Sequence, residues 1–342
     1  MDNNTIDKRR FLAMAAAAAA ALPAAANAAS TPWITPGERW PDNRGQHIQA
    51  HGGGIIHFGG KFWWFGEDRS PGNAPNARYV AAYSSRDLAS WRFEGQVFRL
   101  ENPDGLGENF ILERPKVYYN QATRIFVMYF HLDDTQPGGQ GYKYARVGVA
   151  TAKSISGPYT YVRSFRPLGK ESRDIGQFID DDGSAYLIFE SRPSGGFYIA
   201  SLSADYMSVM DEVAFIKAPL EGGAIVHYDG LYYALGSHLS GWAPNPNVYA
   251  TAKSLKGPWS TFSDIAPPET NTYTSQSSNL VKIVGSRHTA VIYVGDRWKP
   301  DDLTDSRYIW MPVEIGNGKM TLPEPRPWRI DMATGRIDFR SA

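Results

Sequence analysis

Five residues occupy the same place in five similar stretches of the sequence, and three of them are carboxylic acids. Each comes directly before a short segment with a strand-like pattern: His51, Glu113, Asp174, Glu221 and Gln276. Gathering several carboxyl groups in one cavity costs repulsion and desolvation, so such a cluster needs a function to explain it. Two facing carboxyl groups can hydrolyse a glycosidic bond, one as proton donor and the other acting on water or on the anomeric carbon. The five residues therefore predict a catalytic or metal-binding site.

The stretch that follows Glu221 shows how such a residue is positioned. Residues 224–228 are expected to form a strand, and residues 231–238 a second, aromatic one. Between them lies Asp229-Gly230, and Asp-Gly between alternating apolar residues is the strongest short-range signal of a β-hairpin. Similar hairpins follow the other four residues, including one around the Asp-Asp-Asp-Gly turn at 180–183.

A sequence pattern typical of a second hairpin also recurs, so each repeat is expected to contain four strands. Residues 146–159 and 247–259 are near-duplicates that share Ala-Thr-Ala-Lys-Ser and Gly-Pro. Repeats of four strands are typical of β-propellers, and five repeats predict five blades of four antiparallel strands in an all-β fold. The first strand of each blade lines the central channel, which would bring the five residues to one mouth of that channel. A β-sandwich with coincidental turns is the alternative fold.

The composition limits the partners. The 342 residues carry 35 basic and 35 acidic side chains, with no basic run and no acidic tail. A chain of this kind is not expected to bind nucleic acid or an anionic membrane surface. Cysteine is absent, which excludes disulfides, thiolate zinc sites and a cysteine nucleophile.

The first 28 residues resemble a bacterial secretion signal. A basic cluster, Lys8-Arg9-Arg10, precedes Phe-Leu and a run of alanines, and residues 26–28 suit a signal peptidase. The basic pair is similar to a twin-arginine signal, with Lys8 in the place of the first arginine, and an ordinary secretion signal is the alternative. We expect a periplasmic or secreted protein, with a lead-in loop over residues 29–48 and the propeller over residues 49–342.

Aromatic side chains that could stack on sugar rings surround the predicted site. They are Trp63, Trp64, Tyr118, Tyr142, Trp242 and Trp298. Packing between blades is the alternative for each, and it is expected for at least one of the adjacent pair Trp63 and Trp64. Trp242 follows Gly241 in a polar loop, which favours exposure and a role as a sugar platform.

Several motifs together resemble glycoside hydrolase family 43, in the branch that contains exo-β-1,3-galactanases. They are Ala50-His51-Gly52-Gly53, Glu113-Arg-Pro-Lys-Val-Tyr-Tyr-Asn, Ser172-Arg173-Asp174, Ser240-Gly241-Trp242 and Gly295-Asp296-Arg297-Trp298. The resemblance covers nearly all of the chain after the signal. It implies a five-bladed propeller that hydrolyses its substrate with inversion of configuration.

The resemblance implies a role for each residue of the mouth. Glu221 matches the general acid, and Asp174 matches the carboxylate that tunes it. The first blade has Gln49-Ala-His51-Gly where the family usually carries an aspartate base, and the galactanase branch shares this departure. Gln276, assisted by Glu113, is that branch's proposed substitute, and direct activation of water by Glu113 is the simpler chemistry.

Contacts to the sugar are expected from residues around the mouth. Their positions are Gln49, His51, Glu67, Tyr142, Trp242 and Arg297. No cofactor is required for this chemistry and no second histidine lies at ligand spacing from His51, although a structural calcium could use the channel carboxylates.

The sequence thus predicts a monomeric exo-acting enzyme that releases galactose from β-1,3-galactan or arabinogalactan oligosaccharides. A β-galactofuranosidase or α-L-arabinofuranosidase of the same family is one alternative. A non-catalytic sugar-binding propeller, which the missing first-blade aspartate would suit, is another.

Overall fold

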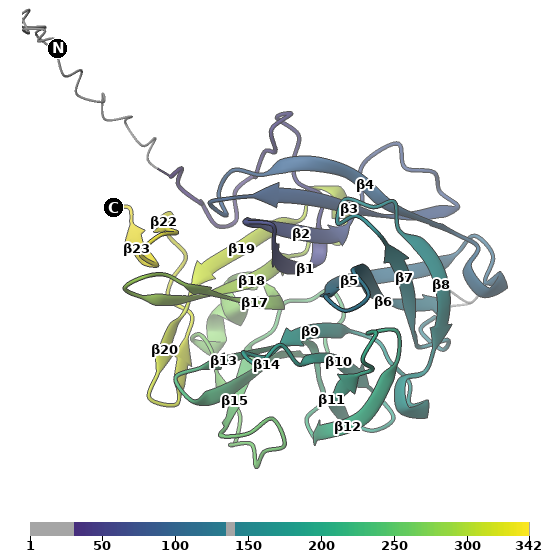
Figure 1. Ribbon diagram of the computed structural model, residues 1–342. Helices are drawn as coiled ribbons and strands as arrows, with labels where there is room; N and C mark the ends of the chain where they lie inside the picture. The colour runs from purple at the N-terminus through teal and green to yellow at the C-terminus, as the bar shows by residue number, and fades with distance from the viewer. Residues whose placement is uncertain (1–30, 135–140, 342) are drawn as a thin grey trace, which may run out of the picture. The chain divides into compact units, whose positions relative to one another are not determined.

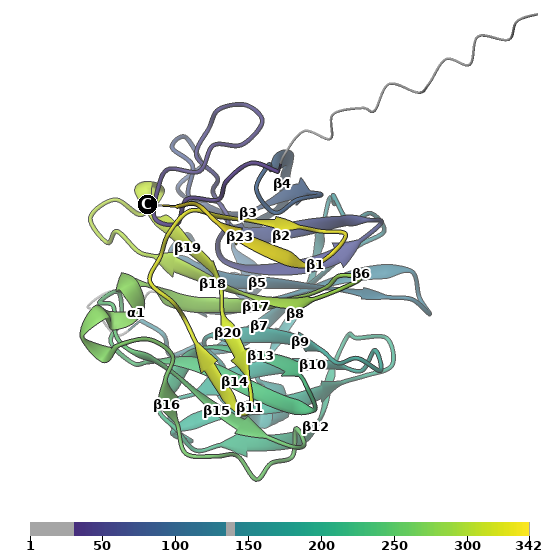
Figure 2. The ribbon, with the colours of Figure 1, turned by 90° about the vertical axis from the view of Figure 1, so that its left-hand side faces the viewer.

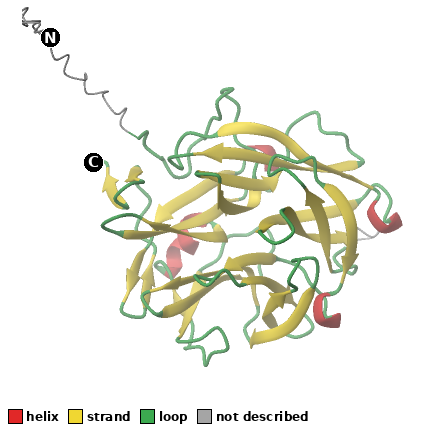
Figure 3. Cartoon of the chain, viewed as in Figure 1, coloured by secondary structure: helices red, strands yellow, loops and turns green. Residues whose placement is uncertain are grey.

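The computed structural model describes residues 31–134 and 141–341, and the predicted signal at 1–28 lies outside them. Five antiparallel sheets surround a central axis, so the predicted five-bladed all-β propeller is confirmed (Figures 1 and 3). The first strands of the sheets contact one another around that axis. No helix among the described residues is long and apolar enough to cross a membrane.

Each of the first four blades contains four strands. The first blade holds β1 (His51–Phe58), β2 (Lys61–Glu67), β3 (Ala77–Ser85) and β4 (Arg92–Glu101). The second holds β5 (Phe110–Asn120), β6 (Ile125–Asp134), β7 (Arg146–Ala152) and β8 (Thr160–Phe165). The third holds β9 (Ile175–Ile179), β10 (Ala185–Ser191), β11 (Gly196–Leu202) and β12 (Val209–Ile216). The fourth holds β13 (Leu220–Tyr228), β14 (Leu231–His238), β15 (Asn247–Ala252) and β16 (Ser263–Asp264).

The fifth blade is the exception, because its sheet has three strands. They are β17 (Gln276–Val284), β18 (Thr289–Arg297) and β19 (Arg307–Pro312). Two short hairpins follow, β20 (Glu314–Gly316) with β21 (Lys319–Thr321) and β22 (Trp328–Asp331) with β23 (Arg336–Phe339). Prolines at 323, 325 and 327 lie between these hairpins, and proline cannot donate to a strand ladder. Figure 2 shows this yellow segment crossing the face turned toward the viewer.

Among the described residues, helical structure is confined to single turns. Short 3₁₀ segments span Pro103–Gly105, Pro167–Gly169, Pro268–Thr270 and Leu303–Asp305, and α1 spans Asn271–Thr274. The predicted hairpin turn is confirmed: Tyr228 pairs with Leu231, and Asp229 and Gly230 have φ values of 49° and 73°.

Aromatic packing joins the first blade to the fifth. Trp64 is 1% exposed, and its ring lies 4.6 Å from that of Trp310 and 4.7 Å from that of Tyr308 between ring centroids. Edge and offset contacts of this kind add to the free energy gained by burying the rings. Apolar packing of these aromatic rings therefore helps to close the ring of blades between the first and the fifth.

Candidate active site

Four of the five mouth residues line one cavity; three lie within the first strands of their blades, and Asp174 directly precedes β9. Glu113, Asp174, Glu221 and Gln276 line a pocket of about 190 Å³. Glu67, Tyr142 and Trp242, which the sequence also predicts, line the same pocket. Typical pockets for drug-sized ligands measure roughly 300–1,000 Å³, so this cavity suits one small unit of a polymer.

A β-bulge follows the mouth residue in four of the blades. In β13, for example, Glu221 pairs with Ser237, and the regular register resumes only at Ala224 opposite Leu235. Comparable register shifts follow His51, Glu113 and, one residue later, Ser277. Bulges re-aim side chains at the ends of sheets, which accounts for the convergence of these residues.

Glu221 is buried among groups that favour its protonated form. Its Oε1 accepts a hydrogen bond of 2.9 Å from the Gln276 amide, and the residue is 6% exposed. Burial, and then the charge of Asp174, raise the pKa of Glu221 to about 8, although Arg114 acts against them. Glu221 can therefore carry a proton at neutral pH, as a general acid must.

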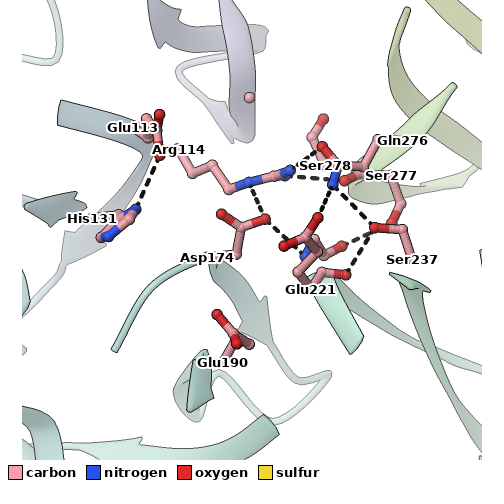
Figure 4. A network of polar contacts seen from close by, with 12 residues as sticks. Glu113, Arg114, His131, Asp174, Glu190, Glu221, Ser237, Gln276, Ser277 and Ser278 are labelled. Atoms are coloured by element: carbon pink, nitrogen blue, oxygen red, sulfur yellow. Dashed lines mark hydrogen bonds and ion pairs between the residues drawn. The ribbon is translucent and has the colours of Figure 1, made fainter. Parts of the chain in front are cut away.

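Glu113 lies in the opposite electrostatic environment. His131 lies 3.1 Å from its Oε2, and the Tyr142 hydroxyl donates to its Oε1 at 3.2 Å. Burial alone would raise the pKa of Glu113, but the hydrogen bond and positive charge of His131 hold it below its usual value. Figure 4 shows Glu113 and Glu221 on opposite sides, with Arg114 and Asp174 between them.

The amide of Gln276 is held in one orientation by four contacts. Its oxygen accepts hydrogen bonds from Arg114 Nη2 at 2.6 Å and from Trp298 Nε1 at 2.9 Å. Its nitrogen donates to Glu221 Oε1 at 2.9 Å and to Ser237 Oγ at 3.1 Å. Arginine and tryptophan are donors only, so an imidic form with a protonated oxygen would face two donors and no acceptor.

Arg114 is the central cation of the site, and sequence reasoning missed it. Its Nε lies 2.6 Å from Asp174 Oδ2, and the side chain is nearly buried. Its φ of 52° places it in the left-handed region, where the bulges of β1 and β13 have Gly52 and Gly222 with φ values of 57° and 64°. A non-glycine residue at such a position is strained, and strain of this kind clusters at functional sites. Alignment of the second repeat with the first and the fourth would have shown an arginine where those two have glycine.

Glu67 and Tyr142 complete the wall beside Glu113. Glu67 forms an ion pair with Arg69 and accepts a hydrogen bond of 3.1 Å from the backbone nitrogen of Arg114. Burial raises the pKa of Glu67 despite the charge of Arg69. Both side chains can therefore offer hydrogen bonds to hydroxyl groups of a sugar in the pocket.

The aromatic candidates divide into two groups. Trp63, Trp64 and Tyr118 are buried in the hydrophobic core, so their packing alternative is the one observed. Trp242 is 39% exposed and packs edge-on against Trp298, with ring centroids 5.0 Å apart. Trp242 and Trp298 both line the pocket. Tyr142 belongs to this second group, because it also lines the pocket, where its hydroxyl donates to Glu113. Of the six aromatic candidates, Tyr142, Trp242 and Trp298 can therefore contact a bound sugar.

Three residues predicted to contact the sugar do not line the pocket. His51 is fully buried and stacks on Tyr308 at 5.2 Å, and its Nε2 lies 3.2 Å from Gln49 Oε1. Gln49 also donates to the Thr304 carbonyl at 2.7 Å. Arg297 Nη2 donates to the Tyr273 carbonyl at 2.8 Å. These contacts fix the loops around the fifth blade. His51 and Gln49 are buried, so the prediction of direct sugar contacts is corrected for these two residues. Arg297 lines an adjoining cavity together with Trp242, Gln276 and Trp298, and its contact with the sugar stays a prediction.

The backbone segment held by Arg297 has an unusual conformation. All four residues of α1, Asn271–Thr274, have φ between 49° and 59°, which makes it a left-handed turn directly before Ser275 and Gln276. Each non-glycine residue in this region costs roughly 1–2 kcal/mol. The Thr272 hydroxyl compensates in part by accepting a hydrogen bond of 2.7 Å from the backbone nitrogen of Asn247.

The comparison with known families agrees with the arrangement of these carboxyl groups. Residues 55–298 match the family described as Glycosyl hydrolases family 43. The chain belongs to glycosyl hydrolase family 43. The carboxyl groups at the channel mouth are accordingly those of a glycoside hydrolase.

Solved structures of family 43 enzymes are similar to this chain. An exo-β-1,3-galactanase from Phanerochaete chrysosporium, solved with galactose, has 41% sequence identity and a TM-score of 0.83, covering 91% of this chain and 71% of its own. An exo-β-1,3-galactanase from Clostridium thermocellum has 32% identity and a TM-score of 0.81, covering 90% and 68%.

A curated relative is more distant. A protein from Xylanibacter ruminicola whose name suggests a β-xylosidase is 25% identical over 184 residues. The match covers 51% of this chain and 32% of that protein, so the chain spans about a third of its length.

Among the residues described, two groups could each hold a metal ion, because each brings three possible ligand atoms within 4.8 Å of one another. They are Glu113, His131 and Asp174, and Asp180, Asp181 and His227. Burial alone would lower the pKa of His131, but hydrogen bonds with Asp133 and Glu113 raise it to about 9, so at neutral pH a metal would have to displace a proton from this imidazole. In the second group, Asp181 forms an ion pair with Lys282. The structural calcium considered from the sequence stays a prediction.

Proposed function

We propose that this protein is an inverting exo-β-1,3-galactanase that releases galactose from the end of β-1,3-galactan chains. One observation carries the proposal: the buried Glu221, with a raised pKa, and the partly buried Glu113, with a lowered pKa, line a pocket for a single sugar unit. Such a pair separates an acid from a base. The similar structures named as exo-β-1,3-galactanases support the choice of substrate.

Glu221 acts as the general acid. It donates its proton to the oxygen of the glycosidic bond as that bond breaks, and the galactan chain shortened by one unit leaves as an alcohol. Asp174 favours the protonated form of Glu221 by its charge, and it stays ion-paired with Arg114 at 2.6 Å. The Gln276 amide fixes the orientation of the Glu221 carboxyl group.

Glu113 acts as the base that activates water. Its ionised carboxylate accepts a proton from a water molecule that attacks the anomeric carbon from the face opposite the leaving group, which gives inversion. The contacts of Gln276 favour a positioning role for that residue, because both hydrogens of its nitrogen are already donated. This sequence of steps uses no cofactor.

The exo mode follows from the size of the cavity. A pocket of about 190 Å³ suits one terminal unit, and Trp242 is placed to stack on a sugar ring at its edge. We also propose that the protein acts as a monomer outside the cytoplasm, exported by the signal predicted at residues 1–28.

An NMR time course on β-1,3-galactobiose tests the proposal. We expect free galactose, seen first as the α-anomer, because inversion at a β-linkage produces it. Appearance of the β-anomer first would contradict inversion. Cleavage of galactofuranosides or arabinofuranosides instead would move the activity to another substrate, and inactivity on all of them would favour a sugar-binding propeller.

A further inference from the structure

Arg192 lies between two buried glutamates at the edge of the pocket. Its Nη2 is 3.4 Å from Glu221 Oε2, and its Nε is 3.3 Å from Glu190 Oε1. The side chain of Arg192 is 46% exposed, whereas the side chains of Glu221 and Glu190 are 7% and 3% exposed. Glu190 Oε2 is buried and has no hydrogen-bond partner. A single guanidinium group is thus shared by two carboxyl groups and saturates neither.

This arrangement matters because an arginine beside a general acid works against its function. A positive charge within about 4–6 Å favours the ionised form of a carboxyl group, and a general acid must keep its proton. The groups that act on Glu221 are Asp174, Arg114, Glu190 and Arg192. Asp174 and Arg114 are ion-paired with each other, so their effects on Glu221 partly cancel. The remaining balance depends on Glu190 and Arg192.

We propose that Glu190 is a positioning residue, which holds Arg192 away from full pairing with Glu221 and so keeps the general acid protonated. This inference rests on the proposed role of Glu221. Glu190 lies in β10, in the blade next to that of Glu221, and its backbone nitrogen donates to the carbonyl of Asp174 at 2.9 Å. Arg192 follows directly after β10, so one strand end positions both partners.

The surroundings of Glu190 suit this task. Burial, and then the charge of Asp174, raise its pKa to about 7, while Arg192, Arg173 and His131 act to lower it. As the pH rises through this range, Glu190 ionises and binds Arg192 more strongly. The competition for Arg192 is therefore greatest where Glu221 would otherwise begin to lose its proton.

Two substitutions with opposite expected effects test the inference. In Glu190→Gln, Arg192 is left to Glu221, so the alkaline limb of the kcat/KM profile on β-1,3-galactobiose should move to lower pH by about half to one unit. In Arg192→Gln, the limb should move to higher pH by a similar amount. The double variant should lie close to the unchanged protein. If the two residues had only a structural role, both variants would lower the rate without moving the alkaline limb in opposite directions. An alkaline limb that moves in the same direction in both variants, or in neither, would overturn the inference.

A second readout does not depend on turnover. The carboxyl carbon of Glu221 can be titrated by ¹³C NMR and assigned by its loss in Glu221→Gln. Glu190→Gln should lower and Arg192→Gln should raise the midpoint of this titration, and unchanged midpoints would overturn the inference. If β-1,3-galactobiose is not cleaved, or if Glu221→Gln stays fully active, the proposed function fails while the titration still decides the role of Glu190.

Discussion

Glu113 and Glu221 lie near the beginning of the first strands of the second and fourth blades, yet they are suited to opposite proton transfers. The residue opposite each one on the second strand differs, since Glu113 pairs with His131 and Glu221 pairs with Ser237. His131 is itself held between Glu113 and Asp133 and has a raised pKa of about 9, so it places a positive charge beside Glu113. The fold repeats the position, and the neighbouring side chain determines the chemistry.

The other neighbours increase this difference. Glu221 has Asp174 and Glu190 nearby, both of which raise its pKa. Glu113 has Arg69 and Arg114 nearby, which lower its pKa further. A repeat protein can thus derive an acid and a base from one structural position by changing the charges around it.

Removal of the acid should have the largest effect. Glu221→Gln keeps the shape but cannot donate the proton, so the turnover of β-1,3-galactobiose should fall by a factor on the order of 10²–10⁴. A nitrophenyl galactoside, whose leaving group needs no proton, should lose far less. Steady-state rates on both substrates check this, and equal losses on the two would assign Glu221 another role.

Removal of the base should cost somewhat less and show a different signature. Glu113→Gln should reduce turnover by about 10²–10³ on both kinds of substrate, because water must be activated whatever leaves. A fully active Glu113→Gln enzyme would rule out a direct role for that carboxylate and return the role of base to Gln276.

Replacement of His131 should make the two glutamates more alike. Without the positive charge of His131, the pKa of Glu113 rises. Because the base must be ionised, the acidic limb of the kcat/KM profile should move to higher pH. For His131→Gln we expect up to roughly tenfold lower kcat/KM below the new pKa, and little change above it. The exposed His57 in β1 provides a matched control, since His57→Gln should leave the limb in place. An unshifted limb in His131→Gln would show that His131 does not set the ionisation of Glu113.

Removal of the Trp242 ring should not change the difference in pKa between Glu113 and Glu221. Trp242→Ala removes a stacking surface, and the KM for β-1,3-galactobiose should rise by roughly 2- to 12-fold, the equivalent of about 0.5–1.5 kcal/mol. The turnover number and both pH limbs should stay in place. Trp242→Phe should recover part of the affinity, and a shifted pH limb would show that Trp242 also affects the acid or the base.

Much of the fold could be predicted because its signals are local. Tight turns such as Asp229-Gly230 recur at each repeat, and the repeats fix the blade count and the order of the mouth residues. The fifth blade was wrongly predicted to have four strands. In the described part of the chain, no fourth strand pairs with the Arg307–Pro312 strand.

The site was harder to predict because bulges and loops decide which side chains reach the pocket. His51 has the same repeat position as Glu113, but Asp296 and Tyr308 surround it and bury it completely. Arg192 and Glu190 gave no motif, because their effect depends on contacts between strand ends that are distant in sequence. The protonation of Glu221 is likewise set by several blades together.

The left-handed turn Asn271–Thr274 has a consequence for protein engineering. A segment of the same length with the usual right-handed twist would direct the chain differently into β17 and misplace Gln276. Grafting this loop onto a related propeller should therefore succeed only if Arg297 and Asn247 are transferred with it, because Arg297 donates to the Tyr273 carbonyl and the Asn247 side-chain amide donates to the Ser275 carbonyl directly after the turn. The turn and the two residues that bind it, Arg297 and Asn247, must therefore be treated as one module in such a graft.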